Sequence, residues 1–343
     1  MPTIKDVSRL AGVSTATVSR VLNGTTPVAP GTRQRVLDAV ATLGFRPNAF
    51  ARGLVTSRAG GIGVTVNEVS SPYFGAAVFG VEQVAREHGI HLLVSSGFAE
   101  AARERGSIDF LVERPCDGLV VQADGLADDD LAELVRHGPV PIVVFGRSVP
   151  GIEAACVVLD NERGGALATA HLLERGHRSI GHVTGPHTFP DARDRLRGYR
   201  RTLEAVGVEY HERYVVESTF REDGGARAAV ALLERAPEIS AIFFGNDQMA
   251  AGGIRALREH GRDVPTDVSV VGFDDVFLAQ YLTPALTTVR QPLVEMGRAA
   301  AHMLLARLGA PGERVAREFA PELVERQSVA HVGNASVPRP GAR

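Results

Sequence analysis

The sequence predicts a small all-α head followed by a larger α/β body of two lobes, each built on a doubly wound parallel sheet. Residues 1–58 carry eight Lys and Arg against two Asp, a net charge of +6, whereas the other residues carry 29 basic and 38 acidic side chains, a net charge of −9. Apolar residues recur at helical spacing in the basic segment, and from residue 61 onward apolar runs alternate with helix-length stretches. With 343 residues, 44% of them hydrophobic, the chain can bury more than one core.

The composition excludes several classes of protein. Only two cysteines occur, so a disulfide-stapled scaffold is excluded, and neither Cys116 nor Cys156 has another Cys or a His at metal-ligand spacing. Lys5, Asp6 and Arg9 stand where a signal peptide needs an apolar core, and no run reaches the ~18 apolar residues of a membrane span. We therefore expect a cytoplasmic protein in a reducing compartment, with no metal, no cofactor and no membrane partner.

The first predicted helix begins after Thr3, a good N-cap residue, and ends at Gly12. Its apolar face consists of Val7, Leu10 and Ala11. A third helix, capped by Thr32 and ended by Gly44, is expected to lie beneath the first two helices. Its inner face consists of Val36, Val40 and Leu43.

The second predicted helix, TATVSRVLN, is capped by Ser14 after a tight turn at Gly12 and Val13. Its inner face consists of Val18, Val21 and Leu22. Its outer face consists of Thr15, Ala16, Thr17, Ser19, Arg20 and Asn23. Two short helices joined by a glycine-containing turn are typical of the helix-turn-helix, whose second helix meets base edges in the major groove.

The chemistry of this outer face favours DNA over the alternative of a helical bundle that makes no DNA contact. Hydroxyls and an arginine suit hydrogen bonds to phosphates and base edges, and the net positive charge of the segment suits a polyanion.

The residues TIKDVSRLAGVSTATVSRVLNG and TRQRVLDAVATLGFRPNAFARGL closely resemble the DNA-binding head of the LacI family of bacterial repressors. The resemblance implies that Thr15, Ala16 and Arg20 read bases and that Thr17, Ser19 and Asn23 lie near the DNA backbone. Arg20 is the strongest candidate for contacting a guanine, because its guanidinium pairs with two acceptors there.

The resemblance also implies domain boundaries: a helix-turn-helix domain at 1–46, a hinge at 47–60, a two-lobed effector-binding and dimerisation domain at 61–330 and a flexible tail at 331–343. Within the hinge, Leu54 falls at the position where a leucine wedges into the minor groove of the operator. The alternative is a plain interdomain linker with Leu54 on its surface.

The body contains a series of apolar runs that predict strands. These runs are IGVTV, IHLLVSS, DGLVVQA, PIVVFG, CVVLDN, IGHVTG, YVVES, AIFFGND and VSVVGFDD. Helix-length intervals between them imply parallel sheets covered on both faces. Almost 280 residues exceed one ordinary sheet domain, so two lobes with a cleft between them are expected. By family resemblance, the chain crosses between lobes near Arg147–Asp160, at Gln291 and at the C-terminal strand FAPELVERQS.

Ligands of such sheets bind outside the carboxyl ends of the strands. Polar and aromatic residues follow the runs, including Asn67, Tyr73 and Asp275, and such a set suits a polyhydroxylated ligand. The family resemblance extends over the body, for example at FFGNDQMAAG and VPTDVSVVGFDD, and implies a periplasmic-binding-protein-like fold. The residues that match effector-contacting positions of the family are Phe74, Arg147, Asp191, Arg195, Phe220, Asn246, Asp274 and Gln291.

The effector class depends on two of the matched positions. Purine-binding relatives carry an arginine and a threonine six and four residues before the equivalent of Arg195, where this chain has Phe189 and Asp191. This departure speaks against a purine and favours a sugar as the effector, while a purine- or nucleoside-responsive repressor stays the alternative. In the family, sugars usually release the DNA and purines tighten its binding.

An enzyme is the more distant alternative, because doubly wound sheets host many catalysts. The chain lacks GxSxG, GxxxxGK[ST] and HExxH motifs, and it has no GxGxxG after the first strand of the body.

The tail HVGNASVPRPGAR shows no heptads, so no tetramer-forming zipper is expected. We therefore predict a non-enzymatic repressor that binds a palindromic operator as a homodimer and responds to a mono- or oligosaccharide.

Overall fold

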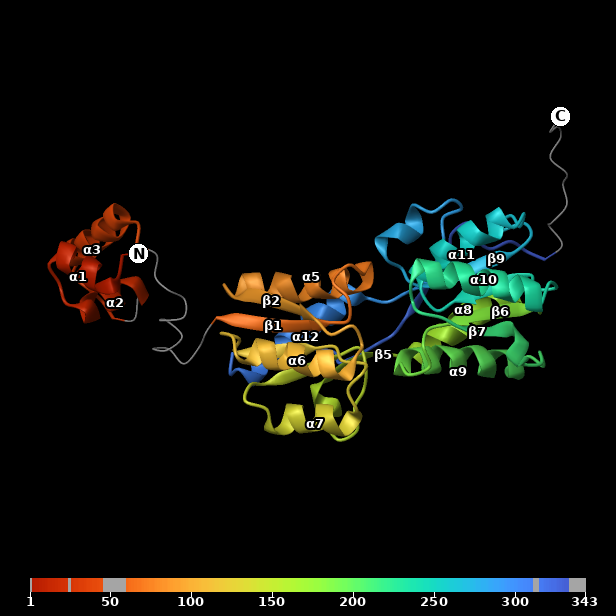
Figure 1. The fold of residues 1–343 in the computed structure, drawn as a ribbon, viewed down its shortest axis with the longest axis horizontal. Helices are drawn as coiled ribbons and strands as arrows, with labels where there is room; N and C mark the ends of the chain where they lie inside the picture. The colour runs from red at the N-terminus through yellow and green to blue at the C-terminus, as the bar shows by residue number, and fades with distance from the viewer. Residues whose placement is uncertain (1, 24–25, 46–59, 311–314, 333–343) are drawn as a thin grey trace, which may run out of the picture. The chain divides into compact units, whose positions relative to one another are not determined.

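The computed structural model describes residues 2–23, 26–45, 60–310 and 315–332 (Figure 1). The chain divides into two compact units, Met1–Gly60 and Gly61–Arg343. Within the described residues, the first unit is all-α and the second contains two α/β lobes, so the predicted fold class is confirmed. None of the helices in the described residues is long and apolar enough to cross a membrane.

The head contains α1 (Ile4–Ala11), α2 (Thr15–Asn23) and α3 (Pro30–Leu43) in its described part. The side chain of Asp6 accepts hydrogen bonds from the backbone N and the hydroxyl of Thr3, at 2.9 and 2.7 Å, and these bonds fix the start of α1. The three helices enclose a small core formed by Val7, Ala11, Val18, Val21, Val36 and Ala39.

Two details of the head differ from the prediction. Helix α3 begins at Pro30 with Ala29 as its N-cap residue, instead of after Thr32. Proline suits this position because its φ is already helical and it has no N–H that needs an acceptor. Leu10 is 54% exposed, since Val7 and Ala11 fill the inner face of α1.

The first lobe is built on a sheet with the strand order β11-β5-β4-β3-β1-β2, in which all neighbours are parallel. Its strands are β1 (Gly61–Val66), β2 (His91–Ser96), β3 (Gly118–Val121), β4 (Ile142–Phe145), β5 (Cys156–Leu159) and β11 (Glu318–Phe319). Helices α5 and α12 pack together on one face, and α6 and α7 cover the other (Figure 1). These helices are α5 (Pro72–Glu87), α6 (Ala101–Val112), α7 (Asp128–His137) and α12 (Leu293–Arg307).

The second lobe repeats this plan with the strand order β12-β10-β9-β8-β6-β7, in which only the β10–β12 pair is antiparallel among the described strands. Its strands are β6 (Ile180–Thr184), β7 (Val215–Glu217), β8 (Ala241–Phe244), β9 (Ser269–Asp274), β10 (Thr287–Arg290) and β12 (Glu322–Val324). Helix α8 packs on α9, and α10 packs on α11. These helices are α8 (Asn161–Glu174), α9 (Pro190–Ala205), α10 (Glu222–Arg235) and α11 (Asp247–Glu259).

The chain passes between the lobes after β5, after β10 and between β11 and β12. The predicted C-terminal strand FAPELVERQS is therefore wrong as a single strand: β11 and β12 are short strands that belong to different sheets. Pro321 lies between them and has no N–H to continue a ladder, which explains the break.

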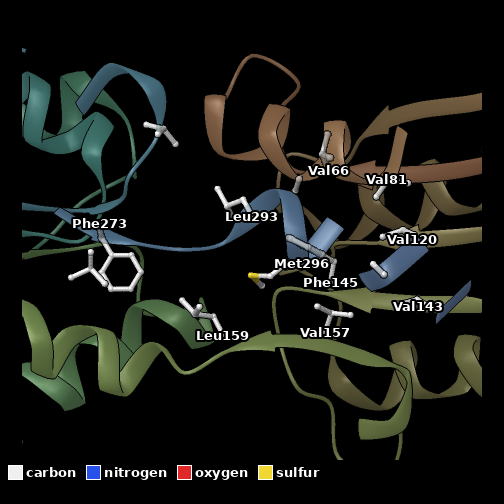
Figure 2. Close-up of a cluster of buried hydrophobic side chains, with 14 of the residues drawn as sticks. Val66, Val81, Val120, Val143, Phe145, Val157, Leu159, Phe273, Leu293 and Met296 are labelled. Atoms are coloured by element: carbon white, nitrogen blue, oxygen red, sulfur yellow. The ribbon is translucent and has the colours of Figure 1, made fainter. Parts of the chain in front are cut away.

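Beside these crossings, one apolar cluster extends across both lobes (Figure 2). Leu159 ends β5 and Leu293 begins α12, and both are buried in this cluster. Phe145 and Met296 join it from the first lobe and Phe273 from the second. The crossings therefore run through packed apolar surface, which keeps the two lobes together.

Helix α5 carries two glycines with opposite surroundings. A Cβ at Gly80 would lie 2.1 Å from the carbonyl oxygen of Val294 in α12, whereas a Cβ at Gly75 would meet nothing within 4 Å. We expect Gly80→Ala to lower the free energy of unfolding by ~1 to 3 kcal/mol through overpacking. Gly75→Ala should raise it by up to ~1 kcal/mol through helix propensity. Urea unfolding of both variants measures this, and equal effects would contradict the close packing of α5 on α12.

Candidate functional site

The outer face of α2 is the candidate DNA-reading surface of the head. Thr15, Ala16 and Arg20 are exposed, while Thr17 and Ser19 are half-buried. The Ser14 hydroxyl accepts a hydrogen bond from the backbone N of Thr17 at 3.1 Å, which caps the helix at the end that would enter a groove. Of the other predicted DNA-contacting residues, Leu54 and the side chain of Asn23 lie outside the described residues.

The candidate ligand site is a cavity of about 480 Å³ between the lobes of the body. Its walls are the loops that follow β1, β2 and β3 in the first lobe and β6, β7 and β8 in the second, together with the end of β9. The carboxyl ends of both sheets thus meet at this cavity, as expected for parallel α/β sheets.

Six of the eight residues predicted to contact an effector line this cavity. They are Phe74, Asp191, Arg195, Phe220, Asn246 and Asp274. The predicted Arg147 and Gln291 are outside its lining.

Arg195 projects from α9 and is only 3% exposed. Its Nε donates to Asn161 Oδ1 at 2.9 Å, its Nη1 to the carbonyl oxygen of Gly245 at 2.5 Å, and its Nη2 to Asp191 Oδ2 at 3.2 Å. The guanidinium also lies 3.8 Å from the centre of the Phe273 ring. A buried charge needs such partners, so the orientation of Arg195 is fixed before a ligand arrives.

Asp274 ends β9 beside this arginine, with its Oδ1 4.0 Å from Arg195 Nη1. Its backbone has φ 107°, a conformation that favours glycine and that turns the side chain from the strand into the site. Burial raises the pKa of Asp274 to about 7. Gln291 donates to Asp274 Oδ1 at 2.6 Å, so it positions this carboxyl from behind instead of lining the cavity.

Two aromatic pairs provide apolar surface in the cavity. Phe220, with φ 60°, meets the ring of Phe189 edge to face at 5.7 Å between centroids. In the first lobe, Tyr73 and Phe74 meet edge to face at 4.9 Å. Asn246 supports the second-lobe pair by donating to the carbonyl oxygen of Phe220 at 3.0 Å.

Arg147 is buried but turned away from the cavity. Its Nη2 donates to the carbonyl oxygen of Leu126 at 2.8 Å, and its Nη1 lies 3.5 Å from Asp128 Oδ1. These partners belong to the chain after β3, which explains why a residue at the end of β4 stays outside the lining.

The sequence prediction missed several polar residues of the first-lobe wall, among them Gln122 and Asp124. Gln122 and Asp124 line the cavity, and Asp124 Oδ2 accepts hydrogen bonds from Asn67 Nδ2 at 2.7 Å and Gln122 Nε2 at 3.1 Å. Burial raises the pKa of Asp124 to about 6. The signal was present, since Gln122 directly follows the apolar run DGLVV and Asp124 stands two residues further on.

The loop that holds Asp124 is fixed from below by Glu104. This side chain is 1% exposed and accepts hydrogen bonds from the backbone N of Asp124, Gly125 and Leu126 at 2.8 to 3.0 Å. A carboxylate that satisfies three successive backbone donors holds the loop in one conformation.

Two contacts join the lobes at the mouth of the cavity. Arg221 Nη1 of the second lobe lies 2.9 Å from Glu68 Oε2 of the first, and the Ser71 hydroxyl donates to Gln248 Oε1 at 3.1 Å.

The described residues contain no group of three or more His, Cys, Asp and Glu side chains that could hold a metal ion.

A helix-turn-helix head and a two-lobed body around a cleft define a class of ligand-responsive DNA-binding regulators. The family model "Bacterial regulatory proteins, lacI family" matches residues 3–48, and "Periplasmic binding protein-like domain" matches residues 169–329. The transcriptional regulator GalR of Salmonella typhimurium (strain SL1344) is 43% identical over 330 residues, which cover 96% of this chain and 96% of GalR.

Solved structures agree with these matches. A complex of the transcriptional regulator CelR with cellobiose has a TM-score of 0.71 at 35% identity, with 96% of this chain and 100% of that chain covered. The lac repressor dimer bound to operator and the anti-inducer ONPF has a TM-score of 0.83 at 27% identity, with 96% and 99% covered. This chain belongs to the LacI family of bacterial regulatory proteins, and it is a DNA-binding transcriptional regulator.

The buried carboxyl of Asp274 predicts a pH dependence of stability. Because burial raises its pKa from 3.8 to about 7, the folded protein binds a proton that the unfolded chain has already released in this range. The free energy of unfolding of wild type relative to Asp274→Asn should therefore fall as the pH rises toward about 7 and then stay level, with a slope of at most ~1.4 kcal/mol per pH unit. Urea unfolding of both proteins between about pH 5 and about pH 8 measures this difference. A constant difference would contradict the burial of this charge.

Proposed function

We propose that the protein is a repressor that binds a palindromic operator as a homodimer and that a mono- or oligosaccharide in the cleft controls its affinity for the operator. The observation that carries the proposal is the cavity between the lobes, which combines carboxylates and amides with the aromatic rings of Phe74 and Phe220. Sugar hydroxyls pair with carboxylates and amides, and the apolar face of a sugar stacks on a ring.

On the DNA side, we propose that Thr15, Ala16 and Arg20 contact base edges and that Thr17, Ser19 and Asn23 contact the DNA backbone. The exposure of the first three residues on one helix supports this assignment. The proposed wedge in the minor groove is Leu54 of each subunit, at the centre of the operator.

Coupling between the two sites is proposed to run through β1. This strand begins at Gly61, directly after the proposed hinge at 47–60, and it leads to Asn67 in the cavity wall. A ligand that draws Asn67 and Asp191 together would move the lobes relative to each other around the crossings. This movement would strain or strengthen the contacts of Glu68 with Arg221 and of Ser71 with Gln248 at the mouth of the cavity. Such closure is a shift between an open and a closed state of the lobes. The ligand can shift this equilibrium only by as much as its affinities for the two states differ.

The first test is thermal unfolding of the full chain against a panel of mono- and oligosaccharides, nucleobases and nucleosides. A specific ligand stabilises the folded state by ~2.7 kcal/mol at a concentration of 100 times Kd. We expect the melting temperature to rise with one sugar and the same sugar to change operator binding in a mobility-shift assay. If only nucleobases raise the melting temperature, the effector is a purine and not a sugar. If no compound of the panel raises it, a small-molecule effector of either class is contradicted.

The DNA-reading role of Arg20 has a matched test. Arg20→Ala should weaken binding to an operator selected from random DNA by ~1 to 3 kcal/mol and should relax selectivity at one base pair. Arg35→Ala removes the same charge from an exposed position of α3. It should weaken binding to every DNA sequence by about the same amount, and by less than Arg20→Ala weakens binding to the selected operator. Fluorescence anisotropy on the selected operator and on its single-base variants measures both effects. Equal losses for the two variants would contradict base reading by Arg20.

A further inference from the structure

One aromatic ring of the cavity differs from the others in its exposure. The aromatic residues of the described lining are Tyr73, Phe74, Phe98, Phe189 and Phe220. Phe98, in the loop after β2, is 51% exposed, whereas the other four are half-buried. The lining therefore contains an aromatic ring that packing within the protein does not cover.

The backbone at this ring has a conformation that residues with a side chain rarely adopt. Phe98 has φ 54° and Ala99 has φ 55°. Such a conformation costs free energy and persists only where surrounding contacts impose it, which is most common at ligand sites. Here the backbone N of Phe98 donates to the carbonyl oxygen of Asn67 at 2.9 Å. The carbonyl oxygen of Ala99 lies where Gly125 leaves room, since a Cβ there would be 2.6 Å away.

The same hydrogen bond places Phe98 at the mouth of the cavity. Its acceptor, Asn67, directly precedes Glu68, which pairs with Arg221 of the second lobe across the mouth. The guanidinium carbon of Arg103 lies 5.5 Å from the centre of the Phe98 ring. Because the side chain is still 51% exposed beside this neighbour, a part of the ring stays open to a bound molecule.

The cavity has room for more than one sugar ring. Its volume is about 480 Å³. Cavities of ~300 to 1,000 Å³ hold drug-sized ligands, which are larger than a single hexose. A hexose held by the buried Arg195 and Asp274 and resting on Phe220 would leave the exposed end of the cavity, where Phe98 lies, for a second ring.

We infer that Phe98 forms an outer subsite, on which the second ring of a disaccharide stacks while the buried end of the cavity holds the first ring. The apolar face of a sugar and the open part of the phenylalanine ring both leave water in this contact, which favours binding. The contact is absent for a monosaccharide. This inference rests on the proposed sugar effector and decides between a monosaccharide and a disaccharide.

The test is isothermal titration calorimetry of the full chain with glucose, galactose and mannose and with maltose, cellobiose, lactose, melibiose and mannobiose. We expect at least one disaccharide to bind at least about tenfold more tightly than either of its component hexoses. Phe98→Ala should weaken binding of that disaccharide at least about fivefold and change binding of the hexose by less than about twofold. Phe98→Tyr keeps the ring and should keep the preference.

Phe110 of α6 offers a matched control. It is another exposed phenylalanine, at 42%, with the guanidinium carbon of Arg114 3.5 Å from its ring centre, and it lies outside the lining of the cavity. Phe110→Ala should leave the affinities for hexose and disaccharide as in wild type. Unchanged operator binding and melting temperature check that both alanine variants fold.

Three results would overturn the outer subsite and leave the sugar effector standing. The first is a disaccharide affinity no higher than that of the hexoses, and the second is a Phe98→Ala variant that keeps the disaccharide preference. The third is a Phe98→Ala variant that dissociates into monomers in sedimentation velocity, which would assign the ring to a contact between subunits. If no sugar of either size binds while operator binding is intact, the proposed sugar effector fails, and the inference fails with it.

Discussion

The guanidinium of Arg195 is the buried charge on which the second-lobe half of the cleft depends. It joins Asn161, directly after the first crossing, to Gly245, directly after β8, and it approaches Asp274 at the end of β9. A charge that is only 3% exposed is tolerated when every donor has a partner, so the loops that supply these partners must keep their positions. The guanidinium carbon also lies 3.8 Å from the centre of the Phe273 ring, a cation–π contact that adds to these hydrogen bonds. One side chain therefore sets the relative placement of three strand ends.

The two halves of the cleft differ in how completely their polar groups are paired. In the second lobe, Arg195 and Asn246 form their hydrogen bonds with other groups of the protein, and these bonds hold the wall in a rigid arrangement. In the first lobe, the side-chain oxygens of Asn67 and Gln122 accept no hydrogen bond from the protein. A molecule that contacts the first lobe while resting against the rigid wall of the second would favour a particular separation of the lobes. The proposed coupling between ligand binding and affinity for the operator would use this difference.

Much of the fold follows from local patterns in the sequence. Every apolar run from IGVTV to VSVVGFDD forms a strand, and the helices of the head end at Gly12 and Gly44 as predicted. Such features depend on periodicity and on caps, which are local properties. The errors also have local causes: Pro30 begins α3 ahead of Thr32, and Pro321 divides the C-terminal strand. Gln122 and Asp124 show that the strand-end rule was sound but was applied to too few strand ends.

The sequence by itself determined the order of the strands from β1 to β9, the separation of a basic head from an acidic body, and the residue types at the strand ends. Only the tertiary structure decided which of those residues face the cavity. Arg147 turns to Leu126, 21 residues away, and Arg195 reaches Asn161, 34 residues away and Gly245, 50 residues away. Partners at such distances are brought together by strand order and by the packing of both lobes. A buried polar side chain is oriented by whichever partner satisfies its hydrogen bonds, and no local pattern of residues specifies that partner.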